Sequence, residues 1–148
     1  MKTLSIWKLR SRLFAGILVA TSLSPASRAQ DLGMSVEVNV PFAFENGTQH
    51  FAPGLYMIRM EEQHLLLIQG RSQSGLTLTW FDEDLKPSKT TKVVFQRYGD
   101  RYFLSEIWLT GDTTHAYISP SKAEKELEYA ANKTANTGVQ VALLATSH

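Results

Sequence analysis

The stretch MSVEVNV, residues 34–40, decides the fold class of this chain. Its apolar residues occupy every second position, so Met34, Val36, Val38 and Val40 fall on one face of an extended backbone. An α-helix would spread the same four residues around its axis, whereas a half-buried strand sets them together against a core. We therefore predict that residues 34–40 form the first strand of a sheet with one solvated face.

Further extended segments follow at short intervals, and each is bounded by turn residues. Asn46-Gly47 is typical of a tight hairpin, because Gly accepts the positive φ that such turns require. Leu76, Leu78 and Trp80 alternate with threonines, as in an amphipathic strand. This spacing is typical of an all-β domain. The segments expected to be extended are 42–44, 55–60, 65–69, 76–80, 91–97, 101–109 and 113–119.

The hydrophobic period changes after residue 119, where the pattern predicts one amphipathic helix near residues 120–132. Its start has two alternatives: Ser119 as N-cap with Pro120 at the first helical position, or a capping box from Ser121 to Glu124. In either case Glu124 is expected to face water with the other charged residues. The residues expected on the apolar stripe are Ala123, Leu127, Ala130 and Ala131.

Residues 138–146 include the apolar run VQVALLA at 139–145, which is either a last strand or a loosely packed tail. Together the patterns predict a single mainly β domain at residues 30–148. We expect an antiparallel barrel or barrel-like sandwich of about eight strands with one C-terminal amphipathic helix.

Several predicted strands are apolar on both faces. Residues 65–68 are four apolar residues in a row, and in the segment 101–109 the alternation places Phe103 and Ile107 on one face and Tyr102, Leu104 and Trp108 on the other. A solvated outer face would carry polar residues instead. We therefore expect the second face to be covered by the helix, the C-terminal segment or a second copy of the chain.

Residues 1–29 have the three parts of a secretory signal peptide. A basic start without acidic residues precedes the apolar run LFAGILVATSL at residues 13–23, and small residues at Ser27 and Ala29 precede Gln30. The alternatives are a short buried helix or an uncleaved anchor, but eleven apolar residues reach only about half of a ~30 Å hydrocarbon core. We predict export, to the periplasm or the extracellular space, without stable membrane insertion after cleavage.

Charge and cysteine usage exclude several classes of function. Five of the 15 basic residues lie in residues 1–29 and none of the 14 acidic residues does, so the mature chain has ten basic residues and a net charge of −4. A mildly acidic chain without a basic cluster argues against nucleic-acid binding. The chain has no cysteine, which excludes disulfides, thiol catalysis and thiolate metal sites.

The sequence contains no catalytic, cofactor-binding or metal-binding signature. A zinc site would have to combine Glu61, Glu62 and His64 with a distant histidine, and the alternative is a solvated hairpin turn. Glu106 is either a buried acid with a raised pKa or a structural partner of Arg97 or Lys92. The sequence has no Gly-x-Ser-x-Gly nucleophile elbow.

Aromatic residues give the strongest indication of a binding surface, because flat rings supply contact area at low entropic cost. Phe103 and Trp80 are expected in the core. The candidate surface for a ligand or partner consists of Tyr98, Tyr102, Glu106 and Trp108.

Three segments resemble a family of short exported all-β proteins from soil-dwelling Gram-negative bacteria. They are VPFAF at 40–44, FAPGLYMI at 51–58 and VFQRYGDRYFL at 94–104, which resemble a shared pattern V-P-F-x-F, L-P-A-G-x-Y and F-x-R-Y-G-D-x-Y-F-L. This chain has Phe51 and Ala52-Pro53 where the pattern has Leu and Pro-Ala, a small departure inside the turn. That family is uncharacterised, so the resemblance implies export and a β fold and carries over no catalytic residue.

From these patterns we expect an exported, non-enzymatic β domain that binds or assembles at the cell envelope, as a homo-oligomer or with an envelope partner. The first alternative is a lipocalin-like carrier with an apolar cavity at the barrel mouth. The second is a small hydrolase that uses Glu106.

Overall fold

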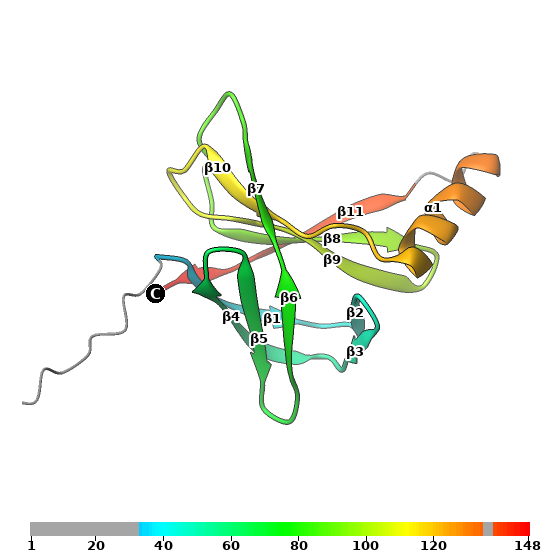
Figure 1. Cartoon of the computed structure of the whole chain (residues 1–148), viewed down its shortest axis with the longest axis horizontal. Helices are drawn as coiled ribbons and strands as arrows, with labels where there is room; N and C mark the ends of the chain where they lie inside the picture. Colours follow the sequence, from blue (N-terminus) through cyan, green and yellow to red (C-terminus); the bar gives the residue numbers. More distant parts are fainter. Residues whose placement is uncertain (1–32, 135–137) are drawn as a thin grey trace, which may run out of the picture.

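A computed structural model describes residues 33–134 and 138–148 of the chain. The predicted signal peptide, residues 1–29, lies outside the described residues. Within them the chain is mainly β, with two sheets and one helix (Figure 1). The predicted fold class, mainly β with a C-terminal helix, is confirmed.

Sheet A is built from the predicted first strand, the three strands within residues 54–78 and a short strand at the C-terminal end. Val36 lies opposite Ile58, and Ile58 lies opposite Ile68, so the apolar residues of three strands share one inner face. Every pairing in this sheet is antiparallel. Its strands in spatial order are β12 (Thr146–Ser147), β1 (Ser35–Val40), β4 (Gly54–Glu62), β5 (Leu65–Gly70) and β6 (Ser74–Leu78).

Sheet B is built around the long hairpin predicted at residues 91–109. A tight turn joins its two strands, and Gly99 at that turn has φ +60°. The last strand confirms the extended alternative for residues 139–145. The strands in spatial order are β11 (Val139–Leu144), β8 (Lys92–Tyr98), β9 (Arg101–Trp108), β10 (Thr114–Tyr117) and β7 (Trp80–Glu83), with the hairpin β2 (Phe44–Asn46) and β3 (Gln49–Phe51) joined to β9.

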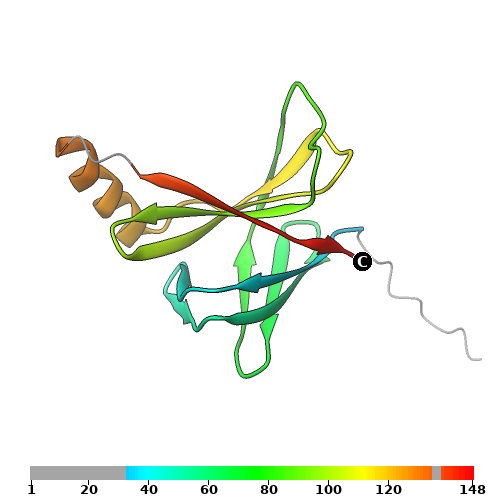
Figure 2. The same cartoon turned by 180° about the vertical axis from the view of Figure 1, so that it is seen from behind.

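Two continuous segments run from one sheet into the other (Figures 1 and 2). β6 passes into β7 through Thr79, and β11 passes into β12 through Ala145. The Thr79 amide donates to the carbonyl of His64 beside β5 at 2.9 Å, and its hydroxyl donates to the carbonyl of Tyr117 in β10 at 2.9 Å. Thr79 therefore bonds to neighbours from both sheets at the point where the strand bends.

The ladders of the described residues form two separate sheets, and no closed ring of strand pairings joins them. They contain twelve strand segments where the sequence predicted about eight strands. Four segments account for the difference: β3 pairs with β2 in a short hairpin, the bends at Thr79 and Ala145 add β7 and β12, and residues 139–144 form β11.

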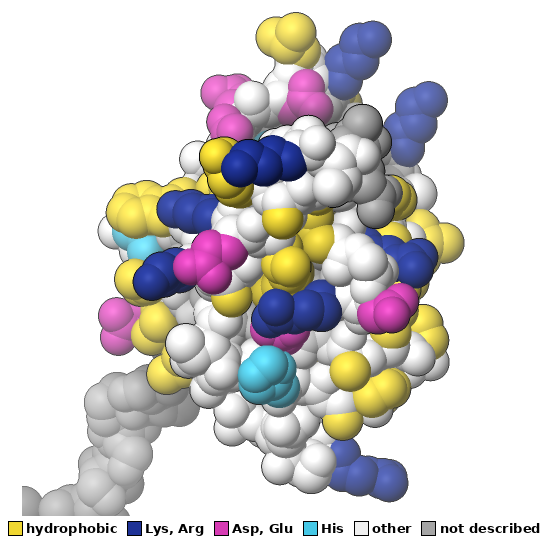
Figure 3. Space-filling view, turned by 90° about the vertical axis from the view of Figure 1, so that its right-hand side faces the viewer, with side chains coloured by type: hydrophobic (Ala, Val, Ile, Leu, Met, Phe, Trp, Pro, Cys, Tyr) yellow, Lys and Arg dark blue, Asp and Glu magenta, His cyan; other side chains and the backbone are white. Residues whose placement is uncertain are grey.

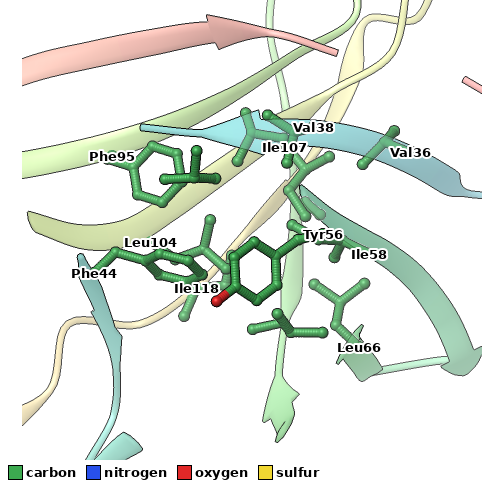
Figure 4. Packing of buried hydrophobic residues seen from close by; sticks show 14 of the residues in the cluster. Val36, Val38, Phe44, Tyr56, Ile58, Leu66, Phe95, Leu104, Ile107 and Ile118 are labelled. Carbon is green, nitrogen blue, oxygen red and sulfur yellow. The ribbon is translucent and has the colours of Figure 1, made fainter. Parts of the chain in front are cut away.

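One hydrophobic core lies between the two sheets. Figure 4 shows side chains of Val36, Ile58 and Leu66 from sheet A meeting Phe95 and Ile107 from sheet B. Each of these five residues is buried. With no cysteine in the chain, burial of these apolar side chains is the main stabilising term, at roughly 1.5–3 kcal/mol per large residue.

The single helix of the described residues, α1 (Lys122–Lys133), lies at the end of sheet B and packs against β8. Its N-cap is Ser121, whose hydroxyl accepts from the Glu124 amide at 3.1 Å, so the capping-box alternative is confirmed. The prediction that Glu124 faces water is wrong, because Glu124 is the buried residue of this helix.

Replacing Thr79 with Val should lower the free energy of unfolding by about 1–2 kcal/mol, because the partly buried Tyr117 carbonyl loses the hydroxyl that donates to it. Urea unfolding of the purified protein measures this change. Thr77→Val is the matched control, since the Thr77 hydroxyl lies 3.5 Å from the Leu78 carbonyl and contributes little. Equal losses in the two variants would contradict a special role for Thr79.

Candidate functional site

A β-bulge in β9 divides the surface predicted from the aromatic residues. Val94 pairs with Glu106, but Phe95 pairs with Leu104, so Ser105 is an extra residue without a partner in β8. The extra residue shifts the in–out alternation by one position, so even-numbered residues before the bulge and even-numbered residues after it point to opposite faces of the sheet. Strict alternation across residues 101–109, which the prediction assumed, therefore fails at this point.

Tyr102 and Leu104 consequently lie on the inner face of β9 together with Ile107. The Tyr102 ring stacks on Phe42 with centroids 3.9 Å apart, and both rings pack against the core. The structure thus separates Tyr102 from Glu106 and Trp108, which lie on the outer face. The expectation that Tyr102, Leu104 and Trp108 share a face is wrong.

Glu106 and Trp108 form a local cluster on the outer face of sheet B. The indole Nε1 of Trp108 donates to Glu106 Oε2 at 2.7 Å, and the indole ring stacks on His115 with centroids 3.8 Å apart. The ammonium of Lys92 lies 4.9 Å from the indole centroid. In the described part of the chain, Glu106 forms no ion pair with Lys92 or Arg97, so the predicted salt bridge is replaced by the indole hydrogen bond.

Tyr98, the fourth predicted residue, lies half-buried beside α1 rather than in the Trp108 cluster. Burial raises the pKa of Tyr98, and the charges of Glu128 and Glu124 raise it further. Burial likewise raises the pKa of Tyr117, again with a contribution from Glu124. Two phenols and a carboxyl from the helix therefore share one poorly solvated region.

Glu124 is the most perturbed acid of the described residues. Its side chain is 6% exposed, and burial raises its pKa from 4.5 to about 7. Neighbouring carboxylates of Glu128 and Glu45 add to the rise, whereas a hydrogen bond from the backbone amide of Ser121 to the carboxylate lowers it. A mostly exposed helix is thus held to sheet B through a carboxyl that is easier to bury when it carries a proton.

The largest departure from the predicted pattern is on β6. Thr77 is half-buried and Thr79 is fully buried, whereas Leu76, Leu78 and Trp80 are 55%, 64% and 54% exposed. The alternation predicted at residues 76–80 is present, but its apolar side faces outward. The expectation that Trp80 belongs to the core is therefore wrong.

These outward residues continue onto the neighbouring strand. Leu76 lies opposite Leu67, and Leu78 lies opposite Leu65; both partners on β5 are only partly buried. An apolar surface spread over adjacent strands differs from a single exposed leucine, which is common on any protein. We name this surface the Leu76 face, and it consists of Leu65, Leu67, Leu76, Leu78 and Trp80.

A groove of about 440 Å³ runs beside β6, and we name it the β6 groove. One wall is formed by β6 and Trp80, and the other by the turn of the β2–β3 hairpin and Ser119. Each of its lining residues is uncharged. They are Asn46, Gly47, Thr48, Gln49, Leu76, Thr77, Leu78, Trp80 and Ser119.

Two other hollows are relevant to the alternative that the chain carries a small apolar ligand. A small one of about 190 Å³ lies at the open end of the core, lined by apolar residues such as Met34, Met60 and Phe81. A wider depression of about 720 Å³ lies on the outer side of sheet A and includes Glu37 and Arg71. Small-molecule pockets usually have volumes of about 300–1,000 Å³, so the hollow at the core is smaller than most.

No group of three metal-ligating side chains comes together in residues 33–134 and 138–148. In the hypothetical zinc set, Glu61 instead contacts Arg59, and His64 Nδ1 lies 3.0 Å from the Thr79 carbonyl oxygen. Across the same described residues, no helix is long and apolar enough to cross a membrane.

Comparison with known proteins finds no match: no protein-family model, curated protein or solved structure is similar to this chain.

Sequence reasoning missed the Leu76 face although its signal was present. Leu65 and Leu67 belong to a run that is apolar on both sides, and Leu76 and Leu78 follow in the next strand. A strand that carries leucine on one side and threonine on the other predicts alternation, but it does not say which side faces the core. Gly75 lies on the same side of β6 as the threonines. It is buried, and a Cβ at this position would collide with Gln49 and Phe51, so the structure accounts for a glycine on the inward side.

Stability should fall as the pH rises from about 4.5 to about 7, because the pKa of Glu124 is higher in the folded protein than in the unfolded chain. The folded state retains a proton that the unfolded state loses between about pH 4.5 and pH 7, so ionisation costs up to about 3 kcal/mol above that window. Urea unfolding at pH 5 and pH 8 measures the difference.

The variant Glu124→Gln should remove most of this pH dependence. Glu126→Gln is the matched control, because Glu126 lies on the same helix with its side chain 69% exposed and should leave the pH profile unchanged. An unchanged pH profile in Glu124→Gln would show that the buried carboxyl does not control the stability.

Proposed function

We propose that this chain is an exported, non-enzymatic β domain that binds another polypeptide at the cell envelope through the Leu76 face. The observation that carries the proposal is the orientation of β6, which directs threonines inward and leucines outward. Full burial of a leucine side chain is worth roughly 1.5–3 kcal/mol. The fold leaves this stabilisation unused at Leu76 and Leu78, and a bound partner would recover part of it.

The orientation of β6 is held by several bonds, which argues that the outward leucines are a built feature. Five residue pairs fix the register with β5, and Thr79 is bonded at both its amide and its hydroxyl. A slip of one residue would turn the leucines inward but would break these contacts. Contiguous exposed apolar surface of this kind marks protein interaction sites.

Export is supported by the N-terminal sequence pattern and by the resemblance described above. We place the mature chain in the periplasm or the extracellular space. We also infer that the two sheets behave as one barrel-like unit, since β6–β7 and β11–β12 each connect them at opposite edges. Two segments that each continue from one sheet into the other limit the movement of one sheet against the other.

The carrier alternative is less well supported than polypeptide binding. Large side chains, including Phe44, Phe95 and Ile107, fill the space between the sheets, and the hollow at its end measures only about 190 Å³. The hydrolase alternative is also less well supported, because the Glu106 carboxylate accepts a hydrogen bond from the Trp108 indole in the described structure. Neither a nucleophile nor a second acid lies beside it in the contacts of that cluster.

Photo-crosslinking at position 78 tests the proposal. A benzoylphenylalanine residue that replaces Leu78 should form a covalent adduct with a polypeptide in cells that make this protein naturally, because that position is central to the Leu76 face. The adduct should disappear when Leu76 is also replaced with Lys, since a charge there penalises burial. Mass spectrometry of the adduct separates a second copy of the chain from another protein.

Lys125 provides the matched control position, because it lies exposed on α1 away from β6. The same crosslinker at position 125 should give no adduct. If positions 78 and 125 give the same products, or if neither reacts, the Leu76 face is not a binding surface.

A further inference from the structure

We propose that the partner binds as an extended, uncharged peptide segment that enters the β6 groove and pairs with the free edge of β6. This inference rests on the proposed function and specifies the kind of partner. In this mode, called β-augmentation, backbone hydrogen bonds supply affinity and alternate side chains supply specificity. Three features of the described structure support it.

The first feature is the position of β6 in its sheet. β6 is the last strand of sheet A and pairs only with β5 within the described residues. The strand bends at Thr79, and only its continuation, β7, joins β10. One edge of residues 74–78 is therefore left without a neighbouring strand, a situation that folded proteins usually avoid or use for binding.

The second feature is the direction of the backbone groups on that edge. In an antiparallel ladder, residues alternate between pairs that exchange hydrogen bonds and pairs that do not. The bonds from Gly70 to Gln73 and from Thr79 to His64 fix this alternation, so Thr77 bonds to β5. The amides and carbonyls of Leu76 and Leu78 must then point to the free edge, where an added strand would find them.

The third feature is the chemistry of the groove. Charged side chains are absent from its lining, so a charged segment would lose its hydration without gaining an ion pair. Leu76, Leu78 and Trp80 offer apolar contact on one side of the edge. These walls fit a segment of β-branched or small uncharged residues.

The groove also indicates why the occupant is a single extended segment rather than the same edge of a second copy. The β2–β3 turn and Ser119 stand opposite β6 and form the second wall. Two copies would each present β6 behind such a wall, so their edges could not come together. A single strand needs only about 4.8 Å of lateral spacing beside β6.

Selection from a library of capped random heptapeptides on the purified mature protein tests this inference. We expect enrichment of uncharged, β-forming sequences. A selected peptide should bind Leu76→Pro at least tenfold more weakly than Leu76→Ala. Both variants shorten the leucine, but only proline removes the amide that faces the free edge, and proline is tolerated on edge strands.

Hydrogen exchange provides a second measurement that does not depend on the proline variant folding. Saturating peptide should slow exchange of the Leu76 and Leu78 amides at least tenfold, whereas the Thr77 amide, already bonded to β5, serves as the internal control. Failure to select any peptide, equal binding to the two variants, or unchanged exchange at Leu76 and Leu78 would each overturn the inference. In those cases a crosslink at position 78 would still support the proposed function, whereas absence of that crosslink would remove both.

Discussion

The hydrogen bonds of Thr79 are the constraint on which the arrangement of this chain depends. Its amide bonds to the end of β5 and its hydroxyl bonds to β10, both at 2.9 Å. With Thr79 held inward, the residues on either side of it must point outward, because side chains alternate along a strand. The exposure of Leu78 and Trp80 is therefore a direct consequence of how one strand passes between two sheets.

A second local irregularity controls the other side of the molecule. The extra residue Ser105 in β9 places Tyr102 in the core and leaves Glu106 and Trp108 outside. Without the bulge, all three would share a face. On the outer face of sheet B, the Trp108 indole donates to Glu106 and stacks on His115, whose Nδ1 atom is buried without a hydrogen-bond partner. The side chains of this cluster contact one another, whereas the described residues leave the Leu76 face uncovered.

The helix shows how a polar group can position an element that contributes little to the core. Only Glu124 of α1 is buried, and it lies near the phenols of Tyr98 and Tyr117. Burial of an acid is tolerable when the acid is protonated, which is why its pKa rises to about 7. The attachment of the helix to sheet B is thereby linked to pH.

The sequence by itself determined the fold class, most strand positions, the Ser121 cap and the extended last segment, because these depend on local alternation, turn residues and capping. It could not determine which side of β6 faces the core, since alternation is symmetric and only the pairing with β5 and the bonds of Thr79 choose a side. Nor could it place the bulge at Ser105 or the burial of Glu124, because both arise from contacts between residues far apart in the chain. The structure also divides the surface predicted at Tyr98, Tyr102, Glu106 and Trp108, because strand register decides which residues share a face, and register is a property of the tertiary structure.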